Sequence, residues 1–263
     1  MTKAQYGLSG SALLLFFLLY FGCKTKPPAQ QEIEKSRLLN AEQTDVNVLL
    51  KEAKASMTSG QQAEVFLLEE ALANLSTEED TAKIDAYKQL ASKWFSLGHP
   101  GISGDYAQKI ADVENTEEAW SIAGTTYTIC VQRSDVEKVR EFCTKRAIQS
   151  FESAISLNPT NVQHKVNLAL CYTENPPADN PMKGILMLRT LDDENPEDAL
   201  INTSLARLAI RTGQYDRAIQ RLQTVLRNEP ANNTANCLIG QAYEKAGKAE
   251  MAVPFIEKCN TVN

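Results

Sequence analysis

The segment Gly213-Gln-Tyr-Asp-Arg-Ala218 recurs as Gly247-Lys-Ala-Glu-Met-Ala252, 34 residues further along the chain. Prolines repeat with a similar period, because Pro159, Pro196 and Pro230 are separated by 37 and 34 residues. An apolar and a small residue stand nine and ten positions after each proline: Leu168 and Ala169, Leu205 and Ala206, Ile239 and Gly240. A fixed period of this length indicates a chain built from repeated supersecondary units.

The repeated unit predicts a helix, a glycine turn and a second helix that ends before proline. Gly213 and Gly247 can adopt the left-handed conformation that closes the carboxyl end of a helix. Pro196 and Pro230 cannot continue a preceding helix. Small residues in both helices allow close packing, and we expect them to face each other as Ala206 with Ala218 and Gly240 with Ala252.

These residues resemble the tetratricopeptide repeat (TPR), with Tyr172 and Tyr243 at its mid-helix aromatic position. The resemblance implies an all-α fold, a TPR-type α-solenoid of antiparallel helix pairs. We expect about four pairs over residues 117–263, and a helical region with degenerate repeats over residues 32–116. The glycine-rich segment Gly98–Gly104 lacks the lysine of a phosphate loop and predicts a turn between paired helices.

The amino-terminal residues predict export. Ala12–Phe21 is ten residues without a charge, which reaches about half of a ~30 Å bilayer core and suits a signal peptide better than a membrane span. The following Gly22-Cys23 resembles the lipobox of bacterial lipoproteins, in the relaxed form of the Bacteroidetes. The resemblance implies removal of residues 1–22 as a lipoprotein signal peptide, lipidation of Cys23, and a flexible tether over residues 23–31. The alternative is an uncleaved signal anchor.

Composition excludes several function classes. The chain has 27 Lys+Arg and 33 Asp+Glu residues, a net charge of -6, and no basic block, which argues against nucleic acid as a partner. Its two histidines, His99 and His164, have no metal-ligand spacing around them. His164 and Cys171 lie two turns apart on one predicted helix, too far for a nucleophile and its base. We therefore expect no catalytic site, no metal and no cofactor.

Carboxylate runs such as Glu117-Glu118 predict solubilising charges or charges that match the helix dipole, not acid/base pairs. The TPR resemblance implies that the first helix of each repeat lines a concave groove. Among the groove-facing residues, Arg207, Arg211 and Lys245 suit a carboxylate or an acidic peptide. The alternative is that this surface is an ordinary solvated helix surface. The groove-facing positions in this register are Gln163, Val166, Asn167, Leu170, Thr203, Arg207, Arg211, Gln241 and Lys245.

Four of the cysteines are expected to lie opposite one another, in two pairs, across predicted helix hairpins. Residues that oppose each other in an antiparallel hairpin have a nearly constant sum of residue numbers. Cys130 and Cys143 share that sum, within one, with the opposed pair Tyr127 and Ala147, and Cys237 and Cys259 share it with Tyr243 and Ala252. We predict these two pairs as disulfides, with Cys171 free. Alternatively, these cysteines are small apolar core residues, with Cys237 pointing into the groove.

Together these features predict a lipid-anchored, non-enzymatic TPR scaffold on the periplasmic face of the outer membrane. It is expected to bind envelope proteins, in the assembly of envelope or outer-membrane complexes. The alternative is a glycan- or small-ligand-binding lipoprotein of a nutrient-uptake system. Because TPR arrays usually end in an extra polar helix, we also expect incomplete cover and self-association at the carboxyl end, through Met251, Val253, Phe255 and Ile256.

Overall fold

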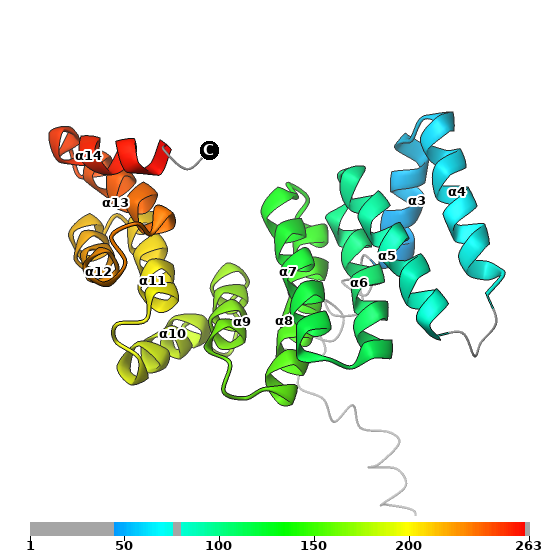
Figure 1. The fold of residues 1–263 in the computed structure, drawn as a ribbon, viewed down its shortest axis with the longest axis horizontal. Helices are drawn as coiled ribbons and strands as arrows, with labels where there is room; N and C mark the ends of the chain where they lie inside the picture. The colour runs from blue at the N-terminus through cyan, green and yellow to red at the C-terminus, as the bar shows by residue number, and fades with distance from the viewer. Residues whose placement is uncertain (1–44, 76–79, 261–263) are drawn as a thin grey trace, which may run out of the picture. The chain divides into compact units, whose positions relative to one another are not determined.

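The structure, a computed structural model, describes residues 45–75 and 80–260. The predicted signal peptide, Cys23 and the tether lie outside these residues. Within them the chain forms twelve α-helices and no strand (Figure 1). The helices preceding the repeats are α3 (Val46–Ser56), α4 (Ser59–Ala73), α5 (Asp80–Ser96) and α6 (Pro100–Glu114).

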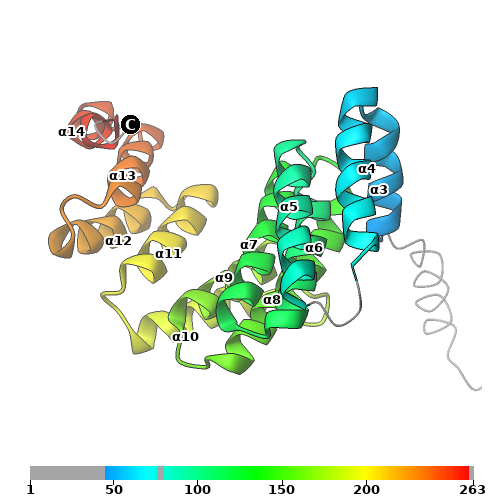
Figure 2. The same cartoon turned by 45° about the vertical axis from the view of Figure 1, so that its right-hand side comes forward.

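Residues 117–260 form four consecutive helix pairs. Each pair packs its two helices against each other, and the first helices α7, α9, α11 and α13 contact in succession (Figures 1 and 2). The predicted all-α, TPR-type solenoid is confirmed. The pairs are α7 (Glu117–Arg133) with α8 (Glu137–Leu157), α9 (Val162–Glu174) with α10 (Lys183–Glu194), α11 (Ala199–Arg211) with α12 (Tyr215–Asn228), and α13 (Asn233–Lys245) with α14 (Ala249–Asn260).

The helix boundaries follow from local chemistry. Gly213 and Gly247 have φ of 76° and 73°, the left-handed conformation expected after a helix end. Two residues after each repeat proline stands an N-cap, whose side-chain oxygen accepts a hydrogen bond from the first turn of the next helix. These caps are Asn161, Asp198 and Asn232.

Glycines in the helices let neighbouring elements approach closely. A Cβ built at Gly124 would lie 2.8 Å from the ring of Phe151, and one at Gly240 would lie 2.9 Å from Ile256. At Gly184 a Cβ would meet the backbone of α9. Three of the four helix pairs, α7–α8, α9–α10 and α13–α14, thus have contacts too close for a larger residue at these positions.

The predicted turn over Gly98–Gly104 is wrong in extent. The turn runs from Leu97 through Gly98, with φ 84°, to His99, and α6 begins at Pro100. Proline is favoured at the first helical position, because its missing N–H has no helical partner there. Gly101 and Gly104 lie inside α6, where the absence of a side chain leaves room for the neighbouring helices. A Cβ at Gly101 would be 3.2 Å from the sulfurs of Cys130 and Cys143, and one at Gly104 would be 2.7 Å from Tyr127.

The apolar residues at the carboxyl end are only partly covered. On α14, Met251 is 51% exposed and Val253 is 52% exposed. Phe255 and Ile256 pack against the core formed by α11, α12 and α13. Among the described residues, no helix combines the length and the apolar character that a membrane crossing requires.

Candidate functional site: the first-helix face

The candidate site is the exposed surface of the first helices α7, α9, α11 and α13, called here the first-helix face. Of the predicted groove residues on α9, Gln163 is exposed and donates a 3.0 Å hydrogen bond from Nε2 to Oδ1 of the half-buried Asn167. Arg211 of α11 is exposed and forms an ion pair with Glu174 of α9.

Three predicted groove residues extend into solvent with no hydrogen-bond or ion-pair partner within residues 45–75 and 80–260. They are Arg207 on α11, and Gln241 and Lys245 on α13. A free guanidinium or ammonium on a helix surface can form charge-assisted hydrogen bonds with a carboxylate of a partner. This part of the first-helix face is therefore basic and available.

The predicted exposure of two other groove residues, Val166 and Thr203, is wrong. Val166 is fully buried, because it packs in the core shared by α9, α10 and α11. Thr203 is buried as well, and its hydroxyl donates 2.8 Å to the carbonyl of Ala199 one turn earlier. Both lie on the side of their helix that faces the neighbouring helices, so neither is available to a partner.

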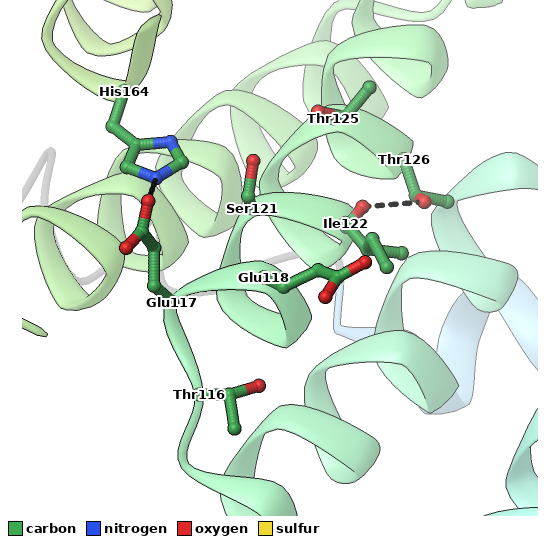
Figure 3. Close-up of a pocket in the computed structure, with 8 residues that line it drawn as sticks. All are labelled: Thr116, Glu117, Glu118, Ser121, Ile122, Thr125, Thr126 and His164. Atoms are coloured by element: carbon green, nitrogen blue, oxygen red, sulfur yellow. Dashed lines mark hydrogen bonds and ion pairs between the residues drawn. The ribbon is translucent and has the colours of Figure 1, made fainter. Parts of the chain in front are cut away.

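A hollow of about 640 Å³ lies beside the amino-terminal half of α7. His164 of α9 stands on one side of it, and Glu118 and Ile122 of α7 stand on the other, with Ser121 between them (Figure 3). The lining residues are Thr116, Glu117, Glu118, Ser121, Ile122, Thr125, Thr126 and His164.

Glu117 connects the α7–α8 pair to α9 at the edge of this hollow. Its carboxylate accepts hydrogen bonds from Asn158 Nδ2 at 2.7 Å and from Asn161 Nδ2, and it lies 2.7 Å from Nε2 of His164 (Figure 3). Hydrogen bonds from Asn158, Asn161 and His164 lower the pKa of Glu117. Glu117 also lies in the first turn of α7, where its charge matches the helix dipole as predicted from the sequence. Its hydrogen bonds to the next helix pair were not predicted.

Asn161 explains why these groups meet. Its Oδ1 caps α9 by accepting from the backbone N–H of Gln163 at 2.9 Å, which turns its Nδ2 toward Glu117. The helix-start signal in the sequence therefore fixes one donor of the Glu117 cluster. The pairing of His164 with a residue 47 positions away carries no local signal.

His164 is almost fully buried, at 4% exposure. With the carboxylate of Glu117 facing Nε2, that nitrogen donates, and in the neutral ring Nδ1 is then an acceptor. Nδ1 is buried and has no hydrogen-bond partner among the described residues. Buried polar atoms are usually paired, so an unpaired one beside a hollow indicates a place where a ligand group or water completes the site.

The structure brings the predicted cysteine pairs together. Cys130 and Cys143 form a disulfide between α7 and α8, and Cys237 and Cys259 form one between α13 and α14. Cys171 is free and buried, and burial raises the pKa of its thiol to about 12. A thiol with so high a pKa is not a nucleophile at neutral pH.

Within the described ranges, no cluster of three or more His, Cys, Asp or Glu side chains is arranged to hold a metal ion. The titratable groups of the hollow are His164, Glu117 and Glu118, and Ser121 lies among them. Among the described residues no hydrogen bond joins the Ser121 hydroxyl to the His164 ring, the contact through which a base activates a serine. The site offers hydrogen bonds, charge and apolar surface, which are the means of binding.

Residues 203–258 match the tetratricopeptide repeat family. A solved tetratricopeptide repeat protein from Parabacteroides merdae ATCC 43184 is similar to this chain, with 14% identity, a TM-score of 0.51, and coverage of 81% of this chain and 78% of that one. At this identity the likeness is one of fold. The comparison with curated proteins found no match.

Two solved MamA proteins are similar at lower TM-scores. One shares 20% identity over 69% of this chain and 90% of its own, with a TM-score of 0.42. The other, from Desulfovibrio magneticus RS-1, shares 15% identity over 67% of this chain and 92% of its own, also with a TM-score of 0.42. The fold of this chain is that of the TPR class, whose usual role is a protein-interaction scaffold.

Proposed function

We propose that this chain is a lipid-anchored scaffold of the bacterial cell envelope, which binds protein partners through its first-helix face and carries out no catalysis. Its place is the periplasmic face of the outer membrane, where it takes part in the assembly of a membrane complex. The observation that carries the binding role is the exposure of Arg207 and Lys245 on this face without an ion-pair partner among the described residues, while the small and aromatic repeat residues are buried.

The disulfides support the exported location. Disulfides form and persist in oxidising compartments and are rare in the cytosol. Both pairs cross a helix hairpin, so each links the two helices of one repeat. The resemblance of Gly22-Cys23 to a lipobox supports the anchor, and the polar residues 24–31 suit a tether between lipid and folded body.

The exposed side of α14 supports a second contact, with another copy of the chain. Met251 and Val253 are half-exposed, so apolar side chains of α14 remain uncovered by the described residues. Apolar side chains exposed on a helix are typical of a surface that a partner covers. A second copy that packs against α14 supplies that cover.

The proposal is tested by formaldehyde cross-linking of intact cells, followed by affinity capture of the tagged full-length chain from membranes. We compare wild type with the Arg207→Glu/Lys245→Glu variant, and with an Arg189→Glu/Lys145→Glu variant that makes the same charge change on the second helices α10 and α8. The expected result is one set of envelope proteins with wild type and with the second variant, and its loss from the first.

Two other results contradict the proposal. Equal capture by all three chains would show that the first-helix face is not the binding surface. Recovery of the chain from the soluble fraction, with an unmodified Cys23, would contradict the anchor. If the chain self-associates through α14, the tagged chain captures an untagged second copy, and Met251→Lys abolishes this capture. A Met251→Lys chain that still captures the second copy overturns that contact.

A further inference from the structure

The hollow beside α7 differs in charge from the rest of the first-helix face. Arg207 and Lys245 make the α11–α13 part basic, whereas two carboxylates, Glu117 and Glu118, border the hollow. The charge of Glu117 is already held by three polar side chains. Glu118 is exposed and has no hydrogen-bond or ion-pair partner in the described parts of the chain, so its charge is the one available to a ligand.

The rest of the lining suits a long side chain with a polar end. Ile122 is 54% exposed and supplies apolar surface next to Glu118 (Figure 3). The hydroxyls of Ser121 and Thr125 have no partner within residues 45–75 and 80–260, in contrast to Thr126, whose hydroxyl donates 2.8 Å to the carbonyl of Ile122. Hydroxyls can accept hydrogen bonds from N–H donors.

His164 adds an independent observation. The residue is only 4% exposed and its Nε2 is held by Glu117, yet Nδ1 has no partner among the described residues. In the tautomer that donates to Glu117, Nδ1 accepts hydrogen bonds. Every unsatisfied polar group of this hollow can therefore accept: a carboxylate, two hydroxyls and one imidazole nitrogen.

We propose that the hollow beside α7 binds a lysine or arginine side chain of a protein partner. The aliphatic stem lies on Ile122 and the cationic head pairs with Glu118, while the hydroxyls of Ser121 and Thr125 accept the remaining N–H groups. The buried Nδ1 of His164 adds an uncompensated acceptor beside the hollow. Long cationic side chains commonly bury their stems on apolar surface in this way. This inference rests on the proposed function and gives the chemistry of one partner contact.

A cation is favoured over the other side-chain classes. An acidic side chain would face Glu118 at short range, and like charges repel. A purely apolar side chain would cover Glu118 and the acceptors without pairing them, which costs free energy. The partner segment that fits the first-helix face as a whole is basic where it meets α7 and acidic where it meets Arg207.

The test is a titration of the isotope-labelled full-length chain, followed by amide NMR. The probes are the blocked tripeptides acetyl-Ala-Lys-Ala-amide, its norleucine counterpart of equal stem length, and its glutamate counterpart. We expect the lysine peptide to cause saturable shifts at Ser121, Ile122 and Thr125, and the other two peptides to bind more weakly.

Glu118→Gln is expected to weaken the lysine peptide about threefold, the effect of one exposed ion pair. Glu141→Gln removes the same charge from α8, outside the hollow, and is expected to leave binding unchanged. Equal affinity of the norleucine or glutamate peptide, no shift at α7, or equal loss in both variants would overturn the proposal.

The outcome is separate from that of the proposed function. If the lysine peptide does not bind the hollow, but Arg207→Glu/Lys245→Glu still abolishes the capture of cross-linked partners, this inference is wrong and the scaffold role stands. A hollow that binds lysine, in a chain that captures no partner, removes the scaffold role instead.

Discussion

Gly184→Ala is expected to lower the free energy of unfolding by about 3 kcal/mol, the upper range for overpacking in a well-packed core. Gly184 lies at the start of α10, where α10 packs against α9. An added Cβ would overlap the carbonyl oxygen of Ala169 and lie 2.7 Å from the backbone nitrogen of Thr173. These are backbone atoms of a neighbouring helix, so they cannot rotate away. Urea denaturation followed by circular dichroism measures the change.

Gly60→Ala is the matched control. A Cβ at Gly60 in α4 meets nothing within 4 Å, so the same added methyl group has no steric cost. Alanine in a helix is favoured over glycine by up to about 1 kcal/mol, so we expect a small gain in stability. A similar loss in both variants would contradict the close approach of α9 and α10.

The Cys130→Ala/Cys143→Ala variant is expected to be about 3 kcal/mol less stable than the oxidised wild type, the usual loss when a native disulfide is removed. The bond joins α7 and α8, and its sulfurs lie against Gly101 of α6, so it supports three helices. Thermal unfolding under non-reducing conditions measures the loss. Cys171→Ala, which changes a buried cysteine that forms no disulfide, is the control and is expected to lose less.

Peptide mapping without reductant checks the same point chemically. The expected map shows Cys130 linked to Cys143 and Cys237 linked to Cys259, with Cys171 as the free thiol of the folded body. A protein purified from its own host in which all five of these cysteines react with an alkylating reagent would contradict both disulfides. It would also remove the main support for an oxidising compartment.

The repeats could be predicted from sequence because their signals are local. A glycine after a helix end, a proline before the next helix and small residues at fixed offsets each act within a few positions, and together they recur with a period. The cysteine pairs follow from the hairpin, since two residues at one level of an antiparallel pair are neighbours. The start of α6 was missed because Gly101 and Gly104 are needed for contacts with α7, which lies beyond local sequence.

Contacts between helix pairs gave no such signal. Arg221 of α12 forms two hydrogen bonds, of 2.9 and 2.8 Å, with Asp192 of α10, and a third of 3.1 Å with Asn202 of α11. One period later Asn236 makes the same backbone contacts as Asn202, but Phe255 stands where Arg221 would be, and Oδ1 of Asn236 is buried without a partner among the described residues. Period alone predicts the helices and not their side-chain partners.

The candidate site was predicted in part for the same reason. Arg207, Gln241 and Lys245 follow from helical register alone, which places them on the exposed side. Val166 and Thr203 fail because both are buried, Val166 in a core that includes residues of α10 and α11, and such contacts between helices carry no local signal. The hollow beside α7 depends on His164, which comes from the next helix pair and meets Glu117 only in the folded chain.

The most direct test of the scaffold role is site-specific photo-cross-linking in intact cells, with a photoreactive residue at matched positions of the full-length chain. Ile122 and Gln241 lie on first helices, while Leu186 and Gln149 lie on second helices; all four side chains are exposed. The proposed function predicts adducts with an envelope protein from positions 122 and 241, and none from 186 and 149. Adducts from the second-helix positions alone, or equally from all four, would contradict binding through the first-helix face.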